Sequence, residues 1–226
     1  MTDPQGTSDF DTFDEDFGLS GLTKYFTYPV KGNRAEGLEL TELLAERYGA
    51  GYAQRVLADL QLLLTAPLPD EVLSTLWLGA TQAHFDPQGE GIGIRDWLEQ
   101  LADVYRTRIR QNQALPLAAV PATGPDAGLR EAVLAELDGV GPALAETVVT
   151  SLYAPPLPEL VPALRRVVTE VDPDLGFRLL LRALKAYFMP ISEVRYQRFL
   201  TLGERFGYHE LVVDDGNLNT WPDLVD

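Results

Sequence analysis

The segment Phe85–Leu101 gathers residue types that bind cations or charged partners. Asp86, Gln88 and Glu90 alternate along a glycine-rich turn, as the first oxygen ligands of an EF-hand calcium loop do. The twelfth position of such a loop needs a bidentate glutamate, and this chain has Trp97 there. Because that ligand is missing, we predict no metal site in the turn.

Residues that carry catalysis are scarce elsewhere in the chain. There is no cysteine, which removes thiol nucleophiles, disulfides and thiolate metal sites. His84 and His209 would need carboxylates to complete a metal site, and both stand near predicted helix ends. Acids at helical spacing, such as Glu42, Glu46 and Asp59, arise by chance among 34 acidic residues. We predict no enzyme activity, no catalytic residue, no metal and no cofactor; a carboxylate-based enzyme is the weakest alternative.

A second motif, G-V-G-P-x-x-A at 139–145, points towards DNA. It resembles the helix-hairpin-helix family, in which backbone amides of a glycine turn bind a phosphate; here those residues are Gly139, Val140 and Gly141. The basic residue that usually follows the hairpin is missing, and acids surround the turn between Glu136 and Glu146. A structural hairpin between two helices is the favoured interpretation, and a DNA-associated scaffold or repair factor is the alternative.

The net charge limits the partners. The chain has 18 basic and 34 acidic residues, a net charge of −16 and a pI near 4.4. Such a field repels phosphates and anionic membranes and attracts basic proteins, although solubility alone would also explain it. The one relatively basic stretch, Arg165–Arg205, is predicted to be a solvated helix face. We expect a basic protein partner, no nucleic acid and no membrane, and leave the oligomeric state open.

Length and composition indicate a folded, soluble protein. At 226 residues with 46% hydrophobic content, the chain can bury a core in one or two domains. Its first residues lack the basic and apolar regions of a secretory signal, and no apolar run approaches the about 20 residues of a membrane-spanning helix. We therefore expect a cytoplasmic protein.

Helical periodicity dominates the chain and predicts a mainly α fold, a compact helical bundle of two subdomains. Glycine and proline mark the breaks, as at Gly49, Gly51 and 155–158. Only Glu210–Val213 has a strand-like pattern, so the C-terminal segment is expected to be irregular or to hold a short strand. The expected helices cover residues 22–26, 40–48, 52–64, 70–79, 97–110, 129–137, 143–152, 160–170, 175–188 and 194–206.

Shifts in composition divide the chain into four parts. Residues 1–18 carry six acids and no base, which predicts a disordered tail, although Phe10, Phe13 and Phe17 would let it fold against a partner. Residues 19–110 form an N-terminal helical domain and residues 129–226 a C-terminal one. Between them, residues 111–128 are rich in proline, alanine and glycine and form a linker or, alternatively, an ordered crossover loop.

A faint internal repeat relates the two helical parts. Leu78-Gly79 precedes Trp97 as Leu202-Gly203 precedes Trp221, with a histidine and a turn between them in each case. If the similarity is a duplication, each copy closes its own core with its tryptophan. Chance similarity between two leucine-rich helical segments is the alternative.

The pair Tyr25-Phe26, the amphipathic helices after it and a D-P-x-x-x-G-x-x-x-R-x-W-L segment follow one another in a recognisable order. This order resembles the immunity proteins of bacterial contact-dependent growth-inhibition systems, which are small helical cytoplasmic proteins. The polar run that usually follows the Tyr-Phe pair is replaced here by Thr27-Tyr28-Pro29, and the C-terminal half has no counterpart in a single-domain member. The matching positions of the closing segment are Asp86, Pro87, Gly91, Arg95, Trp97 and Leu98.

The resemblance implies a non-catalytic, immunity-type antitoxin that neutralises a basic toxin domain by covering its surface. The acids near the turn would then meet the toxin. The alternative is that Asp86 and Glu90 serve the turn and the helix start. Trp97 and Tyr25 are predicted to lie in the core rather than at an interface. The predicted partner-binding residues are Asp86, Glu90, Asp96 and Glu99.

Overall fold

The computed structural model describes residues 16–27, 32–111 and 127–225. It is mainly α-helical, as predicted. The first part of the chain forms α1 (Gly18–Lys24), the 3-10 turn η1 (Tyr25–Thr27), α2 (Arg34–Thr65), α3 (Asp70–Thr81), the 3-10 turn η2 (Pro87–Glu90) and α4 (Ile94–Gln111).

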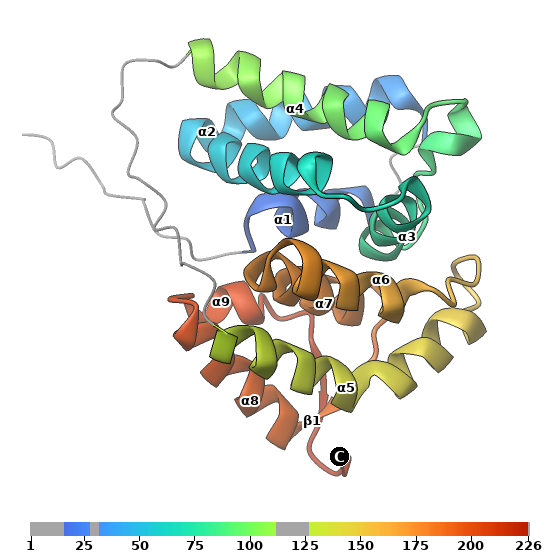
Figure 1. The fold of residues 1–226 in the computed structure, drawn as a ribbon, viewed down its shortest axis with the longest axis vertical. Coiled ribbons are helices and arrows are strands. Elements are labelled where there is room, and N and C mark those ends of the chain that lie inside the picture. Colours follow the sequence, from blue (N-terminus) through green and yellow to red (C-terminus); the bar gives the residue numbers. More distant parts are fainter. Residues whose placement is uncertain (1–15, 28–31, 112–126, 226) are drawn as a thin grey trace, which may run out of the picture.

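The second part of the chain adds more helices and two very short strands. These elements are α5 (Ala127–Thr150), α6 (Leu160–Arg166), the π-helical turn η3 (Val167–Val171), α7 (Pro173–Ala186), β1 (Pro190–Ser192), α8 (Glu193–Arg205), α9 (Glu210–Val213) and β2 (Asn219–Trp221). The helices are stacked along the long axis, with α2 and α4 at one end and α5 and α8 at the other (Figure 1). Between these ends, α1 and α3 lie against α6 and α7.

Most helix boundaries fall where glycine, proline and capping residues predicted them. In α2 the break at Gly49 is confirmed, because this residue has φ 75° and ψ −166° inside an otherwise continuous helix. Only glycine adopts such angles at low cost. The Pro69 N-cap starts α3 with Asp70 and Glu71 in its first turn, where acids favour the positive end of the helix dipole. The break in α2 and the start of α3 therefore follow from local sequence, whereas α2 begins at Arg34, six residues before the predicted start at residue 40.

Two predicted elements are wrong in the second part. The segments 129–137 and 143–152 form a single helix, α5, which bends near its middle around Pro142 (Figure 1). Glu210–Val213 is not strand-like but a helical turn, α9, in which the Leu211 N–H donates to Nδ1 of His209. Val212 and Val213 are both buried, which an alternating strand pattern would not produce. The strands are β1 and β2, paired in parallel with Pro190 opposite Asn219.

An aromatic cluster, defined as Phe26, Trp77, Phe85 and Trp97, fills the core between α1, α2, α3 and α4. The rings of Phe85 and Trp97 are 4.7 Å apart between centroids, and those of Trp77 and Trp97 5.6 Å. The Trp77 indole N–H donates to the Phe85 carbonyl at 2.9 Å, which fixes the chain after α3 against that helix. The prediction that Trp97 lies in the core is confirmed, since none of it is exposed. Tyr25 is only half-buried.

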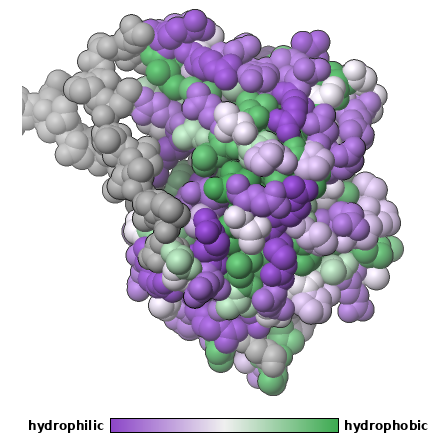
Figure 2. Space-filling model, viewed as in Figure 1, coloured by the Kyte–Doolittle hydropathy of each residue, from purple (hydrophilic) through white to green (hydrophobic). Residues whose placement is uncertain are grey.

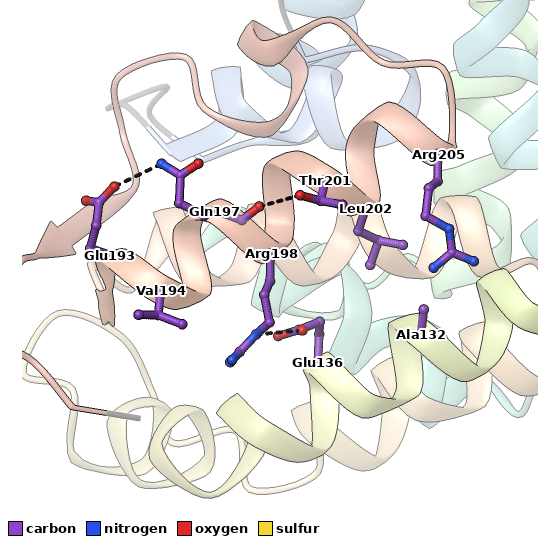
Figure 3. A pocket seen from close by; sticks show the side chains of 9 residues that line it. All are labelled: Ala132, Glu136, Glu193, Val194, Gln197, Arg198, Thr201, Leu202 and Arg205. Carbon is purple, nitrogen blue, oxygen red and sulfur yellow. Dashed lines mark hydrogen bonds and ion pairs between the residues drawn. The ribbon is translucent and has the colours of Figure 1, made fainter.

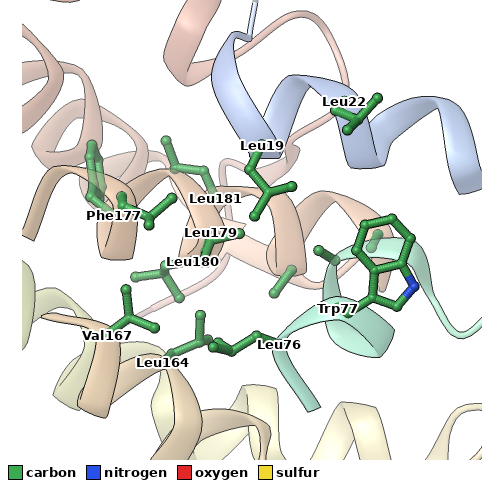
Figure 4. Close-up of a cluster of buried hydrophobic side chains, with 14 of the residues drawn as sticks. Leu19, Leu22, Leu76, Trp77, Leu164, Val167, Phe177, Leu179, Leu180 and Leu181 are labelled. Carbon is green, nitrogen blue, oxygen red and sulfur yellow. The ribbon is translucent and has the colours of Figure 1, made fainter. Parts of the chain in front are cut away.

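The two predicted helical domains share one hydrophobic core. Side chains of α1 and α3 meet those of α6, η3 and α7 in a single cluster (Figure 4). Almost every residue of α7 is buried, because helices cover this central helix on several sides. Helix α4 ends at Gln111 and α5 begins at Ala127, so most of the predicted linker, residues 112–126, lies outside the described residues. The shared cluster includes Leu19, Leu22, Leu76, Trp77, Leu164, Val167, Phe177, Leu179, Leu180 and Leu181.

A second contact between the halves is ionic. Arg178 of α7 is 3% exposed and binds both carboxylate oxygens of Asp59 on α2, at 2.6 and 2.8 Å. The same guanidinium reaches Asp174 at 2.7 Å, and the N–H of Leu19 donates to Asp59 at 2.7 Å. Burial by itself lowers the pKa of Arg178, but the carboxylates of Asp174 and Asp59 outweigh it and raise that pKa. The arginine is therefore charged and fully paired inside the core.

Asp215, in the loop before β2, completes this ionic contact. It binds Lys24 of α1 at 2.9 Å and Lys185 of α7 at 3.1 Å, and its side chain and that of Lys185 are buried. Burial raises the pKa of Asp215, but the attraction of Lys185 and hydrogen bonds from Asn217 and Lys24 hold it well below its ordinary value. We call Asp59, Asp174, Arg178, Lys24, Lys185 and Asp215 the ionic seam.

The ionic seam corrects the prediction that Arg165–Arg205 is a solvated face. Arg178, Arg182, Lys185 and Arg195 of this stretch are all buried. Each has an acceptor inside the protein: Arg182 donates to the Ala80 carbonyl at 3.0 Å, and Arg195 to Glu136 at 3.1 Å. Buried cations are tolerated when such partners are present. The tail prediction is wrong for its last three residues, because Asp16 and Phe17 are described and α1 begins at Gly18; residues 1–15 lie outside the described residues.

The repeat does not extend to the tryptophans. Trp97 is completely buried in α4, whereas Trp221 is 57% exposed in β2. The helices before them share only a buried glycine that permits close packing: a Cβ on Gly79 would touch Leu160, and one on Gly203 would touch Val213. The expectation that each copy closes a core with its tryptophan is therefore wrong for the second segment.

Candidate protein-binding site

The four predicted partner-binding acids lie on one short segment and all are exposed. We call Asp86, Glu90, Asp96 and Glu99 the acidic corner. Glu90 is the last residue of η2, and Asp96 stands in the first turn of α4. Glu99, on the same helix, forms an exposed ion pair with Arg106 at 2.9 Å. These residues are therefore exposed side chains of one segment, which runs from the start of η2 to the second turn of α4.

Asp86 has a structural role as well as an exposed position. One of its oxygens accepts the Gln88 N–H at 2.9 Å and caps η2. This agrees with the interpretation that Asp86 serves the turn. Among the described residues no side-chain hydrogen bond or ion pair is seen for Glu90. Asp86 thus caps η2, and η2 presents Glu90 to solvent.

The acidic corner is held in place by the residues of the D-P-x-x-x-G-x-x-x-R-x-W-L segment. Trp97 anchors α4 in the aromatic cluster. Arg95 donates to Asp70 at 2.7 Å and to the Leu64 carbonyl at 3.0 Å, so it ties the start of α4 to the link between α2 and α3. Gly91 follows η2 with φ 73°. The motif therefore holds the acidic corner in position. Its most buried residues, Trp97 and Leu98, do not themselves reach the surface.

A groove between α2 and α4 lies along the same helix as the acidic corner and has a volume of about 550 Å³. Its α2 wall carries Glu42 and Glu46, and its α4 wall carries Asp103. Two cations border it: Arg34 donates to Gln100 at 2.7 Å, and Arg108 donates to the Glu46 carbonyl at 3.3 Å. The helical spacing of Glu42 and Glu46 is visible in the sequence. Their position in a groove shared with α4 is not.

Hydrophilic residues dominate the end of the molecule that α4 forms. Figure 2 shows them at the top of the view, where Figure 1 places α4. Apolar residues appear mainly lower down, among the layers between the two halves. The candidate surface is therefore charged rather than apolar, and the apolar residues of the same segment are buried beneath it.

The hairpin is absent, both as the favoured structural hairpin between two helices and as the alternative phosphate-binding one. Gly139, Val140 and Gly141 lie inside the continuous helix α5, where backbone N–H groups are used by the helix itself. The glycines serve close packing instead: a Cβ on Gly141 would lie 3.2 Å from Val161, and one on Gly139 would touch the Arg195 guanidinium. This correction removes the geometric basis of the DNA-binding interpretation.

Neither histidine belongs to a cluster that would suggest metal chemistry. His84 is exposed and its Nδ1 lies 3.1 Å from the Thr81 carbonyl, and His209 caps α9. Within residues 16–27, 32–111 and 127–225, no group of three or more histidine, aspartate or glutamate side chains is placed to hold a metal ion. In the same part of the chain, no helix is both long and apolar enough to cross a membrane.

Four tyrosines from three elements contact one another in series: Tyr25 of η1, Tyr48 and Tyr52 of α2, and Tyr105 of α4. The hydroxyls of Tyr25 and Tyr48 are 2.6 Å apart, and the rings of Tyr52 and Tyr105 lie 6.1 Å apart. Burial raises the pKa of Tyr52 and of Tyr105 well above the ordinary tyrosine value, with further contributions to Tyr52 from Tyr105. Both hydroxyls therefore stay protonated near neutral pH.

Comparisons with known proteins add no relative. No protein-family model matches the chain, and no curated protein or solved structure matches it either. The family resemblance thus stays a prediction, and the functional assignment depends on the residues and the geometry described above.

Proposed function

We propose that this chain is a non-catalytic protein-binding module, an immunity-type antitoxin that neutralises a basic toxin domain by covering its surface with acidic side chains. The observation that carries the proposal is the acidic corner: four exposed carboxylates on η2 and α4, held by a buried aromatic cluster. In this proposal the groove between α2 and α4 extends the contact surface along α4.

Charge supports a basic partner. A protein of net charge −16 attracts basic surfaces over a Debye length and speeds their encounter. At the acidic corner, only Glu99 has an ion-pair partner among the described side chains, the half-exposed Arg106. Lysine and arginine side chains of a partner would therefore find carboxylates that need little rearrangement to bind them.

Rigidity supports a preformed surface. The aromatic cluster and the Arg95 hydrogen bonds fix the start of α4, so little conformational entropy is lost when a partner binds there. An interface of standard size needs about 800 Å² from each partner. The acidic corner alone is a small patch, and this is why the proposal includes the neighbouring groove with Glu42, Glu46 and Asp103.

The test is capture of partners from the native host at low and at moderate salt by the tagged full chain. The variant Asp86→Asn/Glu90→Gln/Asp96→Asn/Glu99→Gln removes four charges and keeps the size of each side chain, and an asparagine at 86 still caps η2. We expect a basic protein retained by the wild type to be retained about tenfold less by this variant, since four exposed charges at a few tenths of a kcal/mol each total about 1.4 kcal/mol.

The matched control removes the same number of charges from the other half. Glu131→Gln/Glu146→Gln/Glu204→Gln/Asp223→Asn changes four exposed acids of residues 127–225. This control should retain the partner as the wild type does. Equal loss in both variants would mean that net charge alone drives capture and would contradict the proposed surface. Recovery of nucleic acid, or of no protein at either salt concentration, would contradict the proposed function itself.

A further inference from the structure

The groove between α5 and α8, of about 540 Å³, is balanced in charge (Figure 3). Two arginines, Arg198 and Arg205, and two glutamates, Glu136 and Glu193, line it. Arg198 binds Glu136 at 2.9 Å, and Glu193 accepts a hydrogen bond from Gln197 at the same distance. Charge therefore favours no class of partner for this groove. The loop at the C-terminal end of α5 is more selective.

That loop, residues 151–159, joins α5 to α6 at the edge of the molecule and exposes large apolar side chains (Figure 1). Leu152 is 92% exposed and Tyr153 is 83% exposed. Apolar side chains gathered on an exposed surface mark sites of interaction. The exposed prolines of the same loop are Pro155, Pro156 and Pro158.

Proline fixes the backbone of the loop in one extended form. The ring holds φ of a proline near −65°, and it also keeps the residue before it out of the helical region. Ala154, Pro155 and Leu157 each precede a proline. Residues 155–157 belong to no helix, strand or hydrogen-bonded turn, and the chain bends just before them, at 152–154. A fixed φ near −65° with extended ψ is the polyproline II conformation.

The burial pattern of the loop agrees with this conformation. Ala154 and Leu157 are half-buried and pack against the hydrophobic core, whereas the two residues between them are exposed. A polyproline II helix has three residues per turn, so residues three apart share one face. One face of the segment therefore lies against the protein, and the proline rings are left on its other faces.

Hydrogen bonds hold the loop in place. The Leu157 N–H donates to the Val148 carbonyl of α5 at 3.4 Å, and the Leu157 carbonyl accepts from the Leu160 N–H at 3.1 Å. The Tyr153 N–H donates to the Ser151 hydroxyl at 3.3 Å. A segment that is fixed before binding loses little conformational entropy when a partner binds it.

The hydrogen-bonding character of residues 155–158 limits the partner. Their three prolines have no N–H, and the N–H of Leu157 is already used. The carbonyls of Pro155 and Pro156 accept no hydrogen bond from another described residue. Addition of a partner strand is excluded, because it needs N–H donors on both strands. The partner must instead donate hydrogen bonds and pack flat apolar groups on proline rings, and tryptophan and tyrosine side chains do both.

Charge excludes other occupants. Residues 146–159 include the exposed acids Glu146 and Glu159 and no lysine or arginine. Together with the net charge of −16, these acids repel nucleic acid phosphates and anionic membranes. A second copy of this chain carries the same charge. A protein groove lined by aromatic side chains meets both the hydrogen-bonding and the charge requirement.

We propose that the loop between α5 and α6 is a polyproline II docking segment for a partner protein with an aromatic-lined groove. Pro155, Pro156 and Pro158 present their rings to that groove, and the exposed Tyr153 packs at its edge. This surface goes beyond the proposed antitoxin function and does not depend on it.

The test titrates the full chain into two isotope-labelled probes, a purified WW domain and a purified SH3 domain, both of which bind polyproline II segments through aromatic-lined grooves. We expect saturable shifts of the signals from the aromatic groove of at least one probe, with a Kd of about 1 mM or tighter. The labelled probe also shows which of its surfaces the chain contacts.

A matched pair of variants tests the loop. Pro155→Ala/Pro158→Ala removes two exposed rings and should weaken binding about tenfold. Pro190→Ala/Pro222→Ala changes two exposed prolines outside the loop and should bind as the wild type does. If circular dichroism shows that the first variant does not fold, Tyr153→Ala changes only a side chain that is 83% exposed and should weaken binding severalfold.

The charge variant Asp86→Asn/Glu90→Gln/Asp96→Asn/Glu99→Gln separates this proposal from the proposed function. It should bind the probe as the wild type does, since the acidic corner takes no part in this contact. An equal loss of binding in this variant and in Pro155→Ala/Pro158→Ala would overturn the assignment to the loop.

Other results would also overturn it. One is the absence of saturable shifts with both probes, and another is shifts that lie outside the aromatic groove. Sedimentation of the full chain gives the last: a dimer that Pro155→Ala/Pro158→Ala abolishes would assign the loop to contact with a second copy.

Discussion

The aromatic cluster and the ionic seam are two ways of joining distant segments of one chain. The aromatic cluster brings Phe26, Trp77, Phe85 and Trp97 together within the first half. The ionic seam joins the halves, with Asp59 of α2 against Arg178 of α7 and Asp215 between Lys24 and Lys185. The first is apolar and needs only shape, whereas the second must satisfy every charge that it buries.

This difference has consequences for how each region responds to change. The stability gained by burying apolar side chains does not depend on pH, and truncating such a side chain leaves a destabilising cavity. A buried ion pair adds little net stability when complete, but removal of one partner leaves an uncompensated charge in the core. The aromatic cluster should therefore be sensitive to volume, and the ionic seam to charge and to pH.

The largest effect is expected from Trp97→Ala in the aromatic cluster. The loss of a fully buried indole should reduce the free energy of unfolding by about 3–5 kcal/mol, because it removes apolar contacts and leaves a cavity below the acidic corner. Chemical denaturation followed by circular dichroism measures this. Trp221→Ala, at the exposed tryptophan, is the matched control and should cost far less. Equal losses would contradict the assignment of these two tryptophans to core and surface.

A smaller loss is expected from Asp59→Asn in the ionic seam. The change keeps the volume but removes the charge that Arg178 binds through two oxygens, and loss of one partner of a buried pair costs about 3–5 kcal/mol. Asp174 still binds Arg178 at 2.7 Å, so we place the loss at the lower end of that range. The same denaturation experiment measures it.

A double variant tests whether the ionic seam, rather than the size of Asp59, is responsible. Asp59→Leu/Arg178→Met replaces both partners by apolar residues and should recover part of the stability lost in Asp59→Asn. Asp174→Asn retains the pair between Asp59 and Arg178 and should cost less than Asp59→Asn. If the double variant is the least stable of the three, the seam contributes through more than its charge balance.

The smallest effect is expected from Asp215→Asn. Its loss of unfolding free energy should depend on pH, which separates the ionic seam from the aromatic cluster most directly. The pKa of Asp215 is depressed in the folded protein, so its contribution is present above the unfolded-state pKa of about 3.9 and is lost as pH falls towards the folded-state pKa. We expect wild type to exceed the variant by at least about 1 kcal/mol at neutral pH, with the gap closing below about pH 4.

Urea denaturation at neutral and acidic pH measures that gap. Burial raises the pKa of Asp172, which contributes with the opposite sign, but Asp172 is present in both proteins and cancels in the difference. Trp97→Ala provides the contrast, since its loss of stability relative to wild type should not vary over the same pH range. A gap between wild type and Asp215→Asn that stays constant as pH falls would contradict the role of Asp215 in the ionic seam.

Some features of the candidate site could be predicted from the sequence and others could not. The turn, the helix start after it and the core position of Trp97 follow from local spacing, and the structure agrees with each. The pairing of α2 with α4, which brings Glu42 and Glu46 opposite Asp103, joins residues about sixty positions apart in sequence. No local pattern states which helix a given acidic face will meet.

The second half shows where local patterns mislead. Gly139, Gly141 and Pro142 have the local chemistry of a turn, yet α5 continues through them because Arg195 and Val161 pack onto the glycine surface. Arg178 and Lys185 have the chemistry of a solvated face, yet they are buried because Asp59 and Asp215 reach them from elsewhere in the chain. In both cases a tertiary partner outweighs the intrinsic preference.

The sequence by itself determined the helical class, most helix boundaries and the apolar anchors, because glycine, proline and hydrophobic spacing act over a few residues. Only the tertiary structure decided that Trp221 is exposed and which charges lie in the core. Burial of a charge depends on a partner being present at hydrogen-bond distance, and for Arg178 that partner, Asp59, is 119 residues away in the chain.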